Sequence, residues 1–227
     1  MGYQILLFDL DGTLLDFDAS EQAALKKLFV SKGLNITDDL ICTYEKVNNG
    51  LWRSYENGEI AMSELVNTRF SKTMKHFGMD IDGEAWEKEY RSYLGDYAFI
   101  VEGADEVLKK LSVSHRIFAI TNGVGDTQKN RLKLAGLIDY FEDIFISQLI
   151  GVQKPDIRFF EYVMNNISDF NKEKSIVIGD SVITDIRGGN NAGLDTCLVN
   201  TKGRVYDDSI VRTYEISSLK ELYEICS

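Results

Sequence analysis

The 227-residue sequence is short of cysteine, of positive charge and of long hydrophobic runs. Its three cysteines, Cys42, Cys197 and Cys226, show no metal-ligand spacing, and their odd number argues against a full disulfide framework. No run approaches the roughly 18 apolar residues of a membrane span, and no basic segment followed by an apolar one opens the chain. We therefore expect a soluble, cytoplasmic protein with no membrane partner.

Lysine and arginine number 25 against 36 aspartates and glutamates, which gives a net charge of -11. Such a surface repels a nucleic-acid polymer and an anionic membrane alike. An anionic substrate must then be small, and it must be held by a positively charged group at the binding site, such as a metal ion or a lysine side chain. The only two histidines, His76 and His115, lie in no motif, and we assign them no role.

Hydrophobic residues make up 44% of the chain, enough for one substantial core or for a core domain with a smaller inserted one. Nearly continuous apolar runs of the kind that form buried strands recur along the chain, at residues 3–8, 116–121, 143–147, 175–180, 196–200 and, more weakly, 213–217. Such runs are typical of a parallel sheet covered on both faces. The sequence therefore predicts an α/β fold with a doubly wound parallel sheet, a Rossmann-like core.

The segment between the first two runs is far longer than one crossover helix needs, and its pattern is helical throughout. We interpret residues 17–97 as an inserted helical domain of three or four helices, and residues 1–16 with 98–227 as the α/β core domain. Asp18, with Glu21 three residues on, is typical of a capping box and predicts the start of the first helix.

Polar residues follow the first four apolar runs, where the carboxyl ends of parallel strands line a ligand crevice. Asp9 and Asp11 stand in "LLFDLDGTLLD", residues 6–16. The later positions on this predicted rim are Thr121, Asn122, Lys154, Asp180 and Asp185. Three or more acids, a hydroxyl and a lysine would then converge on one edge of the sheet.

Residues two apart at a strand end project to the same side, so Asp9 and Asp11 are expected to share a pocket while Leu10 points away. With Asp180 they offer an all-oxygen site suited to Mg2+, which pairs well with phosphate. Once metal and lysine reduce the repulsion, Asp9 could attack a phosphoryl group and form an aspartyl phosphate. Asp11 could protonate the leaving oxygen and later take a proton from water.

Phosphate binding is expected from Thr121, from the backbone N–H of Asn122 and from Lys154, the first two near a positive helix terminus. Lys154 could instead be an ordinary loop lysine before a helix-starting proline. Because Pro155 is the only proline of the chain, the functional interpretation is favoured. Asp185 could simply cap the helix that begins near Val182.

The stretches "DLDGT" (9–13), "TNG" (121–123), "KP" (154–155) and "GDSVITD" (179–185) resemble, in order and spacing, the four motifs of the haloacid dehalogenase superfamily of phosphatases. The resemblance covers the whole chain. It implies Mg2+ bound by the side chains of Asp9 and Asp180 and by the backbone carbonyl of Asp11, with Asp185 in the layer behind them. It also implies that the helical insert is a mobile cap.

The presence of Asp11 favours ester hydrolysis over dehalogenation, since a departing halide needs no proton. The stretches at 51–60, 151–162 and 186–200 are similar to the pyrimidine 5'-nucleotidase branch, which implies a pyrimidine nucleoside monophosphate as substrate. A phosphoglycolate or sugar phosphatase and a phosphomutase remain open as alternatives, whereas the intact acid pair argues against an idle binding protein. Trp52, Tyr55 and Asn48 are candidates for reading a base, although both aromatic residues could equally be packing residues of the cap. A monomer or a homodimer is expected.

Overall fold

The computed structural model describes residues 2–206 and 209–227. It divides into two compact units, Met1–Asp18 with Ala98–Ser227, and Ala19–Tyr97. We call the first the core unit and the second the helical unit, and describe each by itself.

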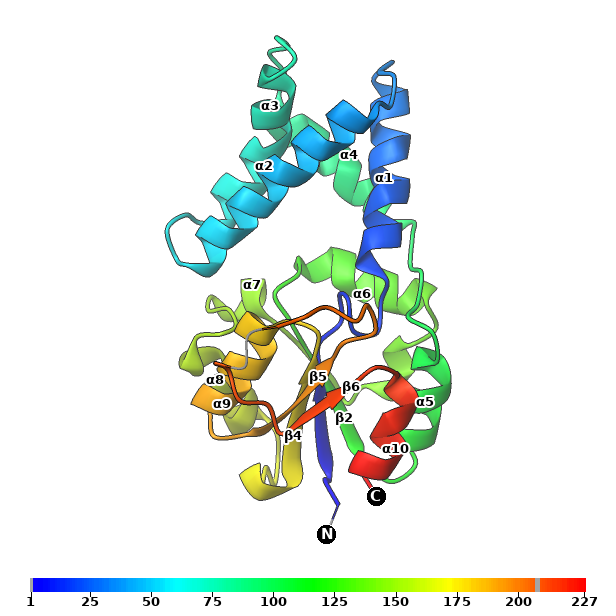
Figure 1. The fold of residues 1–227 in the computed structure, drawn as a ribbon, viewed down its shortest axis with the longest axis vertical. Helices are drawn as coiled ribbons and strands as arrows, with labels where there is room; N and C mark the ends of the chain where they lie inside the picture. The colour runs from blue at the N-terminus through cyan, green and yellow to red at the C-terminus, as the bar shows by residue number, and fades with distance from the viewer. Residues whose placement is uncertain (1, 207–208) are drawn as a thin grey trace. The chain divides into compact units, whose positions relative to one another are not determined.

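The core unit is built on one six-stranded sheet in the order β3-β2-β1-β4-β5-β6, with every adjacent pair parallel. The strands are β1 (Ile5–Phe8), β2 (Arg116–Thr121), β3 (Asp143–Ile146), β4 (Ser175–Gly179), β5 (Asp195–Val199) and β6 (Tyr214–Ile216). The predicted α/β fold with a parallel sheet is therefore confirmed, and each expected apolar run carries a strand (Figure 1).

Both faces of the sheet are covered, as the continuous apolar runs require. In β1, Leu6 and Phe8 pack on one side, against residues of α5 (Ala104–Leu111), α6 (Gly125–Leu134) and α10 (Leu222–Ile225). Ile5 and Leu7 point the other way, onto α8 (Ile157–Asn166). In Figure 1, α5 and α10 lie on one side of the sheet, and α8 with α9 (Gly188–Asn191) on the other.

Two short elements follow strands at the carboxyl edge of the sheet. Helix α7 (Ser147–Ile150) comes directly after β3, and a π-helical segment, Val182–Arg187, follows β4 and runs into α9. The helix expected near Val182 is therefore present, in π-helical form. Pi-helical turns are rare and are frequently found at functional sites, and this one lies at the edge of the sheet where the site is expected.

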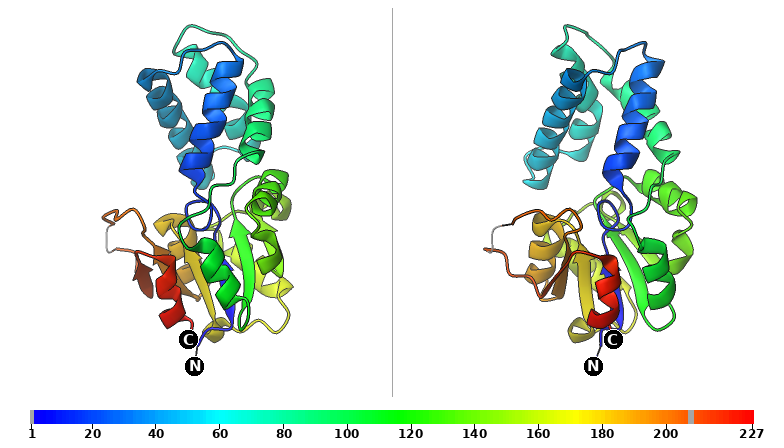
Figure 2. Two further views of the ribbon diagram at one scale, coloured as in Figure 1. Left: turned by 90° about the vertical axis from the view of Figure 1, so that its right-hand side faces the viewer. Right: turned by 45° about the vertical axis from the view of Figure 1, so that its right-hand side comes forward.

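The helical unit consists of α1 (Phe17–Ser31) from Ala19 onward, α2 (Asp38–Glu56), α3 (Met62–Lys75) and α4 (Gly83–Gly95), as Figure 2 shows. Two of its helices, α2 and α4, begin at polar caps, where Thr37 accepts from the N–H of Leu40 and Asp82 from that of Ala85. The prediction for the first helix was wrong by one residue. Helix α1 begins at Phe17, so Asp18 lies in its first turn and not at the cap.

The interior of the helical unit is aromatic. The Tyr44 and Phe70 rings are stacked with their centres 5.4 Å apart, and the Phe70 and Tyr90 rings are tilted with their centres 5.3 Å apart. Glu21, expected to close a capping box, accepts hydrogen bonds from the Tyr44 and Tyr90 hydroxyls through Oε1.

Among the described residues of the whole chain, no helix combines the length and apolar character needed to cross a bilayer.

Candidate active site

The pairing of β1 with β4 and β2 brings the predicted residues to one edge of the sheet. Phe8 is in register with Ile178, and the N–H of Asp9 donates to the Ile178 carbonyl at 2.8 Å. Asp9 and Asp180 each stand one residue past the end of their strand, and Thr121 is the last residue of β2. The edge therefore collects side chains from positions more than a hundred residues apart in the sequence.

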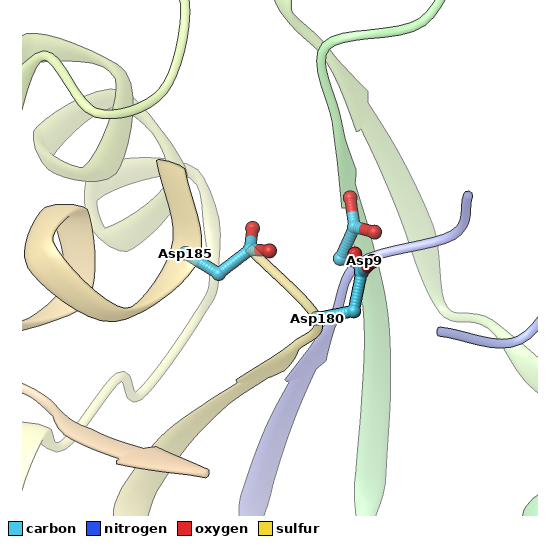
Figure 3. A group of neighbouring side chains, drawn as sticks. All are labelled: Asp9, Asp180 and Asp185. Carbon is cyan, nitrogen blue, oxygen red and sulfur yellow. The ribbon is translucent and has the colours of Figure 1, made fainter. Parts of the chain in front are cut away.

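Three carboxylates meet at this edge, from Asp9, Asp180 and Asp185, with one oxygen of each within 4.8 Å of the others. Figure 3 shows their side chains turned toward one another. The Asp11 carboxylate is not in this group. Its oxygens accept instead from Gln128 and Arg131 of α6. Asp9 and Asp11, expected to share a pocket, thus make different contacts.

Lys154 is the cation of the cluster and is 1% exposed. Its Nζ donates to Asp9 Oδ1 at 2.7 Å, to Asp185 Oδ1 at 2.6 Å and to the carbonyl of Ile120 at 3.0 Å. Burial by itself would lower the pKa of Lys154, but the charges of Asp185 and Asp9 outweigh it and raise that pKa above its ordinary value. The lysine therefore stays protonated and fixes the Asp9 carboxylate.

One ammonium does not balance three carboxylates. Burial, with Asp185 and Asp180 nearby, raises the pKa of Asp9 well above its ordinary value even against the charge of Lys154. Burial, followed by the charge of Asp185, likewise raises the pKa of Asp180 to about 7. A divalent cation would supply the missing charge, and carboxylate oxygens this close together are the ligands that Mg2+ prefers. The residues present fit such an ion.

Two glycines make room for the acids. Gly12 has φ +87°, and a Cβ there would collide with the Asp180 carboxylate. At Gly179 a Cβ would collide with the Asp185 side chain, which also accepts from the Ser181 N–H at 3.1 Å. The glycines of "DLDGT" and "GDSVITD" therefore serve the packing of the carboxylates.

The Thr121 hydroxyl oxygen accepts from the N–H of Gly123 and from Gln128 Nε2, both at 3.0 Å. These contacts use its two lone pairs, so its hydroxyl hydrogen is the group that could donate to a phosphate oxygen. The Asn122 side chain is used differently. Its Nδ2 donates to the Lys154 carbonyl and its Oδ1 accepts from the Lys154 N–H, both at 2.9 Å. Asn122 therefore tethers the segment that carries Lys154.

Sequence reasoning missed three buried residues at this edge, Thr13, Gln128 and Arg131. The Thr13 hydroxyl donates to Asp9 Oδ2 at 3.3 Å, which gives each oxygen of that carboxylate a partner. The signal for Thr13 was its place in "DLDGT". For the two α6 residues the signal was a polar pair three apart on a helix that follows "TNG", which by itself is also typical of a solvated face.

The candidates for reading a base lie in the helical unit. Asn48 is 4% exposed, with its Oδ1 accepting from Arg69 Nη1 at 3.2 Å and its Nδ2 donating to Glu21 Oε1 at 3.4 Å. Tyr55 is buried, and Trp52 is partly buried beside it, with their rings edge to face at 5.8 Å. Of the three, Trp52 is the most exposed.

Comparison with known proteins defines the class. Residues 6–199 match the model of the haloacid dehalogenase-like hydrolase family. The chain belongs to this family, and the expectation drawn from its four motifs is confirmed.

Three relatives are similar over nearly the whole chain. HAD-hydrolase YfnB of Bacillus subtilis is 42% identical over 98% of this chain and 95% of its own. Pyrimidine 5'-nucleotidase PynA of Streptococcus pneumoniae is 40% identical over 99% and 95%. Pyrimidine 5'-nucleotidase YjjG of Escherichia coli is 30% identical over 99% and 98%. The expected likeness to the pyrimidine nucleotidase branch is thus confirmed.

A crystal structure of B. subtilis YfnB, bound to magnesium and described as revealing interdomain movement, matches with a TM-score of 0.94 over 100% of this chain and 99% of that one. L-2-haloacid dehalogenase from Xanthobacter autotrophicus, at 15% identity, shares the fold with a TM-score of 0.76 over 98% and 97% of the two chains.

Proposed function

We propose that this protein is a Mg2+-dependent phosphatase that hydrolyses phosphate monoesters through an aspartyl phosphate on Asp9, with pyrimidine nucleoside 5'-monophosphates as its preferred substrates. The observation that carries the proposal is the carboxylate cluster of Asp9, Asp180 and Asp185, which holds one buried lysine and an excess of negative charge. Relatives named pyrimidine 5'-nucleotidase, 40% and 30% identical, support the substrate class.

The side chains of Asp9 and Asp180 and the backbone carbonyl of Asp11 would hold Mg2+, with Asp185 behind them. When bound, the ion neutralises the carboxylates and a phosphate together, which lowers the barrier to attack by an anion. Lys154 contributes a second positive charge, since its Nζ already lies 2.7 Å from Asp9 Oδ1. The crystal structure of YfnB bound to magnesium supports this choice of ion.

Asp9 is the nucleophile of the proposed reaction, because the hydrogen bonds from Lys154 and Thr13 fix its two oxygens. A fixed carboxylate loses little freedom on the way to the transition state. Thr121 donates its hydroxyl hydrogen to a phosphate oxygen, and the Asn122 backbone N–H lies beside it in the chain. These donors stabilise the charge that develops on the phosphoryl oxygens.

Asp11 protonates the leaving ester oxygen and then takes a proton from the water that hydrolyses the aspartyl phosphate. General acid–base catalysis of this kind contributes about 10²- to 10⁴-fold per step. A halide leaves without a proton, so the acid at this position favours an ester as substrate. The proposed role predicts that Asp11 matters most for esters whose leaving oxygen is basic.

The helical unit is proposed to act as the cap, within the predicted bounds 17–97. The compactness of residues 19–97 supports a separate unit. The interdomain movement described for YfnB, a relative similar over nearly its whole length, supports mobility of the cap. A mobile cap would exclude water and select the leaving group.

A panel of phosphate monoesters, assayed by phosphate release with Mg2+ and again after EDTA, tests the proposal. We expect dUMP, dTMP and UMP to be hydrolysed with higher kcat/KM than dAMP and dGMP, and EDTA to abolish activity until Mg2+ is restored. Full activity in metal-free buffer would contradict the metal site. Phosphoglycolate or a hexose phosphate as the best substrate by a wide margin would reject the nucleotidase assignment and leave the reaction class intact.

A further inference from the structure

The carboxylate of Asp11 is held at both oxygens by one helix. Arg131 Nη1 donates to Oδ1 at 2.5 Å, and Gln128 Nε2 donates to Oδ2 at 2.8 Å. Arg131 Nη1 also donates to Gln128 Oε1 at 3.1 Å, so the two donors are tied to each other. Residues three apart lie on the same face of a helix, and α6 therefore presents them to Asp11 as a pair.

This pair is built into the core unit. Arg131 is fully buried and Gln128 is 2% exposed. The Arg131 guanidinium lies 5.4 Å from the centre of the Phe17 ring. A Cβ on Gly123 would lie 2.5 Å from Gln128 Nε2, so the third residue of "TNG" leaves space for the glutamine amide. Burying a guanidinium is costly unless it is paired, and Asp11 supplies the charge that compensates it.

Gln128 also connects Asp11 to the phosphate end of the site. The same Nε2 that donates to Asp11 Oδ2 donates to Thr121 Oγ1 at 3.0 Å. The glutamine thus fixes the Thr121 hydroxyl and the Asp11 carboxylate relative to each other. A carboxylate has about four acceptor sites, so two remain on Asp11 for the ester oxygen and for water.

We propose that Arg131 and Gln128 are positioning residues that set the orientation of Asp11 for proton transfer; this rests on the proposed function, in which Asp11 is the general acid and base. The Asp11 side chain has two rotatable bonds, and proton transfer requires it within hydrogen-bond reach of the reacting oxygen. Hydrogen bonds to both oxygens restrict that freedom before the substrate arrives. A small misplacement of a catalytic group can cost about 10²-fold in rate.

The competing explanation is purely structural, in which the pair only anchors α6 to the loop after β1. The two explanations differ in their kinetics. If the pair only anchors α6, its removal would lower kcat for all substrates alike. That fold-loss in kcat would multiply with the fold-loss caused by Asp11→Asn. Positioning by Arg131 acts only through Asp11, so its effect should matter for basic leaving groups and vanish once Asp11 no longer carries a transferable proton.

The test uses the full-length protein with Arg131→Met, Arg131→Lys and Gln128→Ala, each with Asp11 intact and with Asp11→Asn. Lys129→Met, an exposed cation on the same helix, is the control. Steady-state kinetics are measured with dUMP, whose leaving oxygen is basic, and with p-nitrophenyl phosphate, whose leaving group needs little protonation. Thermal unfolding of every variant is followed by circular dichroism.

For dUMP we expect Arg131→Met to lower kcat by about 10²-fold and Gln128→Ala by about 10-fold, with KM changed less than about threefold. Arg131→Lys should recover part of the loss. With p-nitrophenyl phosphate the loss caused by Arg131→Met should be several times smaller, and in the Asp11→Asn background it should disappear. Gln128→Ala should keep, with both esters and in both backgrounds, the part of its loss that comes from its hydrogen bond to Thr121.

The positioning role would be overturned if Arg131→Met lowered kcat equally for both esters and if that loss multiplied with the loss caused by Asp11→Asn. If Arg131→Met fails to fold, Arg131→Lys decides by the same criteria. Undiminished dUMP turnover by Asp11→Asn would refute the proposed acid itself, a result distinct from failure of the positioning role alone.

Discussion

Each unit of the molecule buries a network of charged side chains, and the two networks are built differently. In the helical unit, Glu87 binds Arg69 through two hydrogen bonds of 2.7 Å and Arg91 through an ion pair of 2.6 Å. With Glu21 this network contains two carboxylates and two guanidinium groups. The core unit places three carboxylates around the single ammonium of Lys154.

The difference separates a structural network from one that accommodates a ligand. A buried charge whose partners lie in the same chain needs nothing from solution. In the core network the positive charges of Lys154 and Arg204 do not outweigh burial and the charge of Asp185, which raise the pKa of Asp180 to about 7. Excess negative charge marks the place where a cation from solution would bind, a criterion that uses neither a motif nor a relative.

The largest effect is expected at the nucleophile of the core network. Asp9→Asn preserves the shape of the side chain but removes the attacking charge, so kcat should fall at least about 10⁴-fold for every ester. Phosphate release by the purified variant is the measurement, and Asp139→Asn, an exposed aspartate of the same unit, is the control. Near-normal turnover by Asp9→Asn would reject the assignment.

The second prediction concerns the helical unit. Glu87→Gln leaves Arg69 buried without its full countercharge and should lower the free energy of unfolding by about 3–5 kcal/mol. Urea unfolding measures the change, and Lys27→Met is the control. The ion pair of Lys27 with Asp96 is largely exposed, so its loss should change the free energy of unfolding very little. Similar small changes in both variants would mean that the Arg69 network contributes no more than a surface pair.

The third prediction uses pH to expose the uncompensated charge. Because the pKa of Asp180 is raised to about 7, the metal-free folded protein binds a proton that the unfolded chain has lost, and stability decreases as pH rises from about 4 to 7. Over this range the free energy of unfolding of the wild type should fall by about 1–3 kcal/mol more than that of Asp180→Asn. Urea unfolding in EDTA at pH 5 and pH 8 measures the difference. A difference that is constant or of opposite sign would contradict the prediction.

The smallest effect is expected at Trp52. If its partly exposed ring contacts the base, Trp52→Ala should reduce the preference for dUMP over dAMP several-fold and leave p-nitrophenyl phosphate hydrolysis nearly intact. A parallel fall for all three substrates would show instead that Trp52 is a packing residue beside Tyr55.

The strands could be predicted because a sheet buried on both faces requires continuous apolar runs, and such runs are rare elsewhere in this chain. For β1, β4 and β5 the observed bounds lie within two residues of the predicted ones. The start of α1 was misplaced because acidic residues are favoured both at the N-cap of a helix and within its first turn, where Asp18 lies. Local pattern does not distinguish these neighbouring positions.

Which acids meet is a matter of topology and was only partly predictable. The rule that parallel strands end at one edge brings Asp9 and Asp180 together. The separation of Asp11 from that group depends on α6, whose Gln128 and Arg131 bind its oxygens. A glutamine and an arginine on a helix ordinarily face water, and only the packing of α6 against the loop after β1 buries them.

The most direct test of the central claim is the change in Tm on adding Mg2+ to EDTA-treated protein at pH 7.5, measured for wild type, Asp180→Asn and Glu87→Gln. Mg2+ should raise the Tm of wild type by several degrees. Asp180→Asn should melt at a higher temperature than wild type without metal, and Mg2+ should raise its Tm little. Glu87→Gln should melt lower and gain as much as wild type. An equal Mg2+ shift in wild type and Asp180→Asn, or none in wild type, would contradict the assignment of the core network as the metal site.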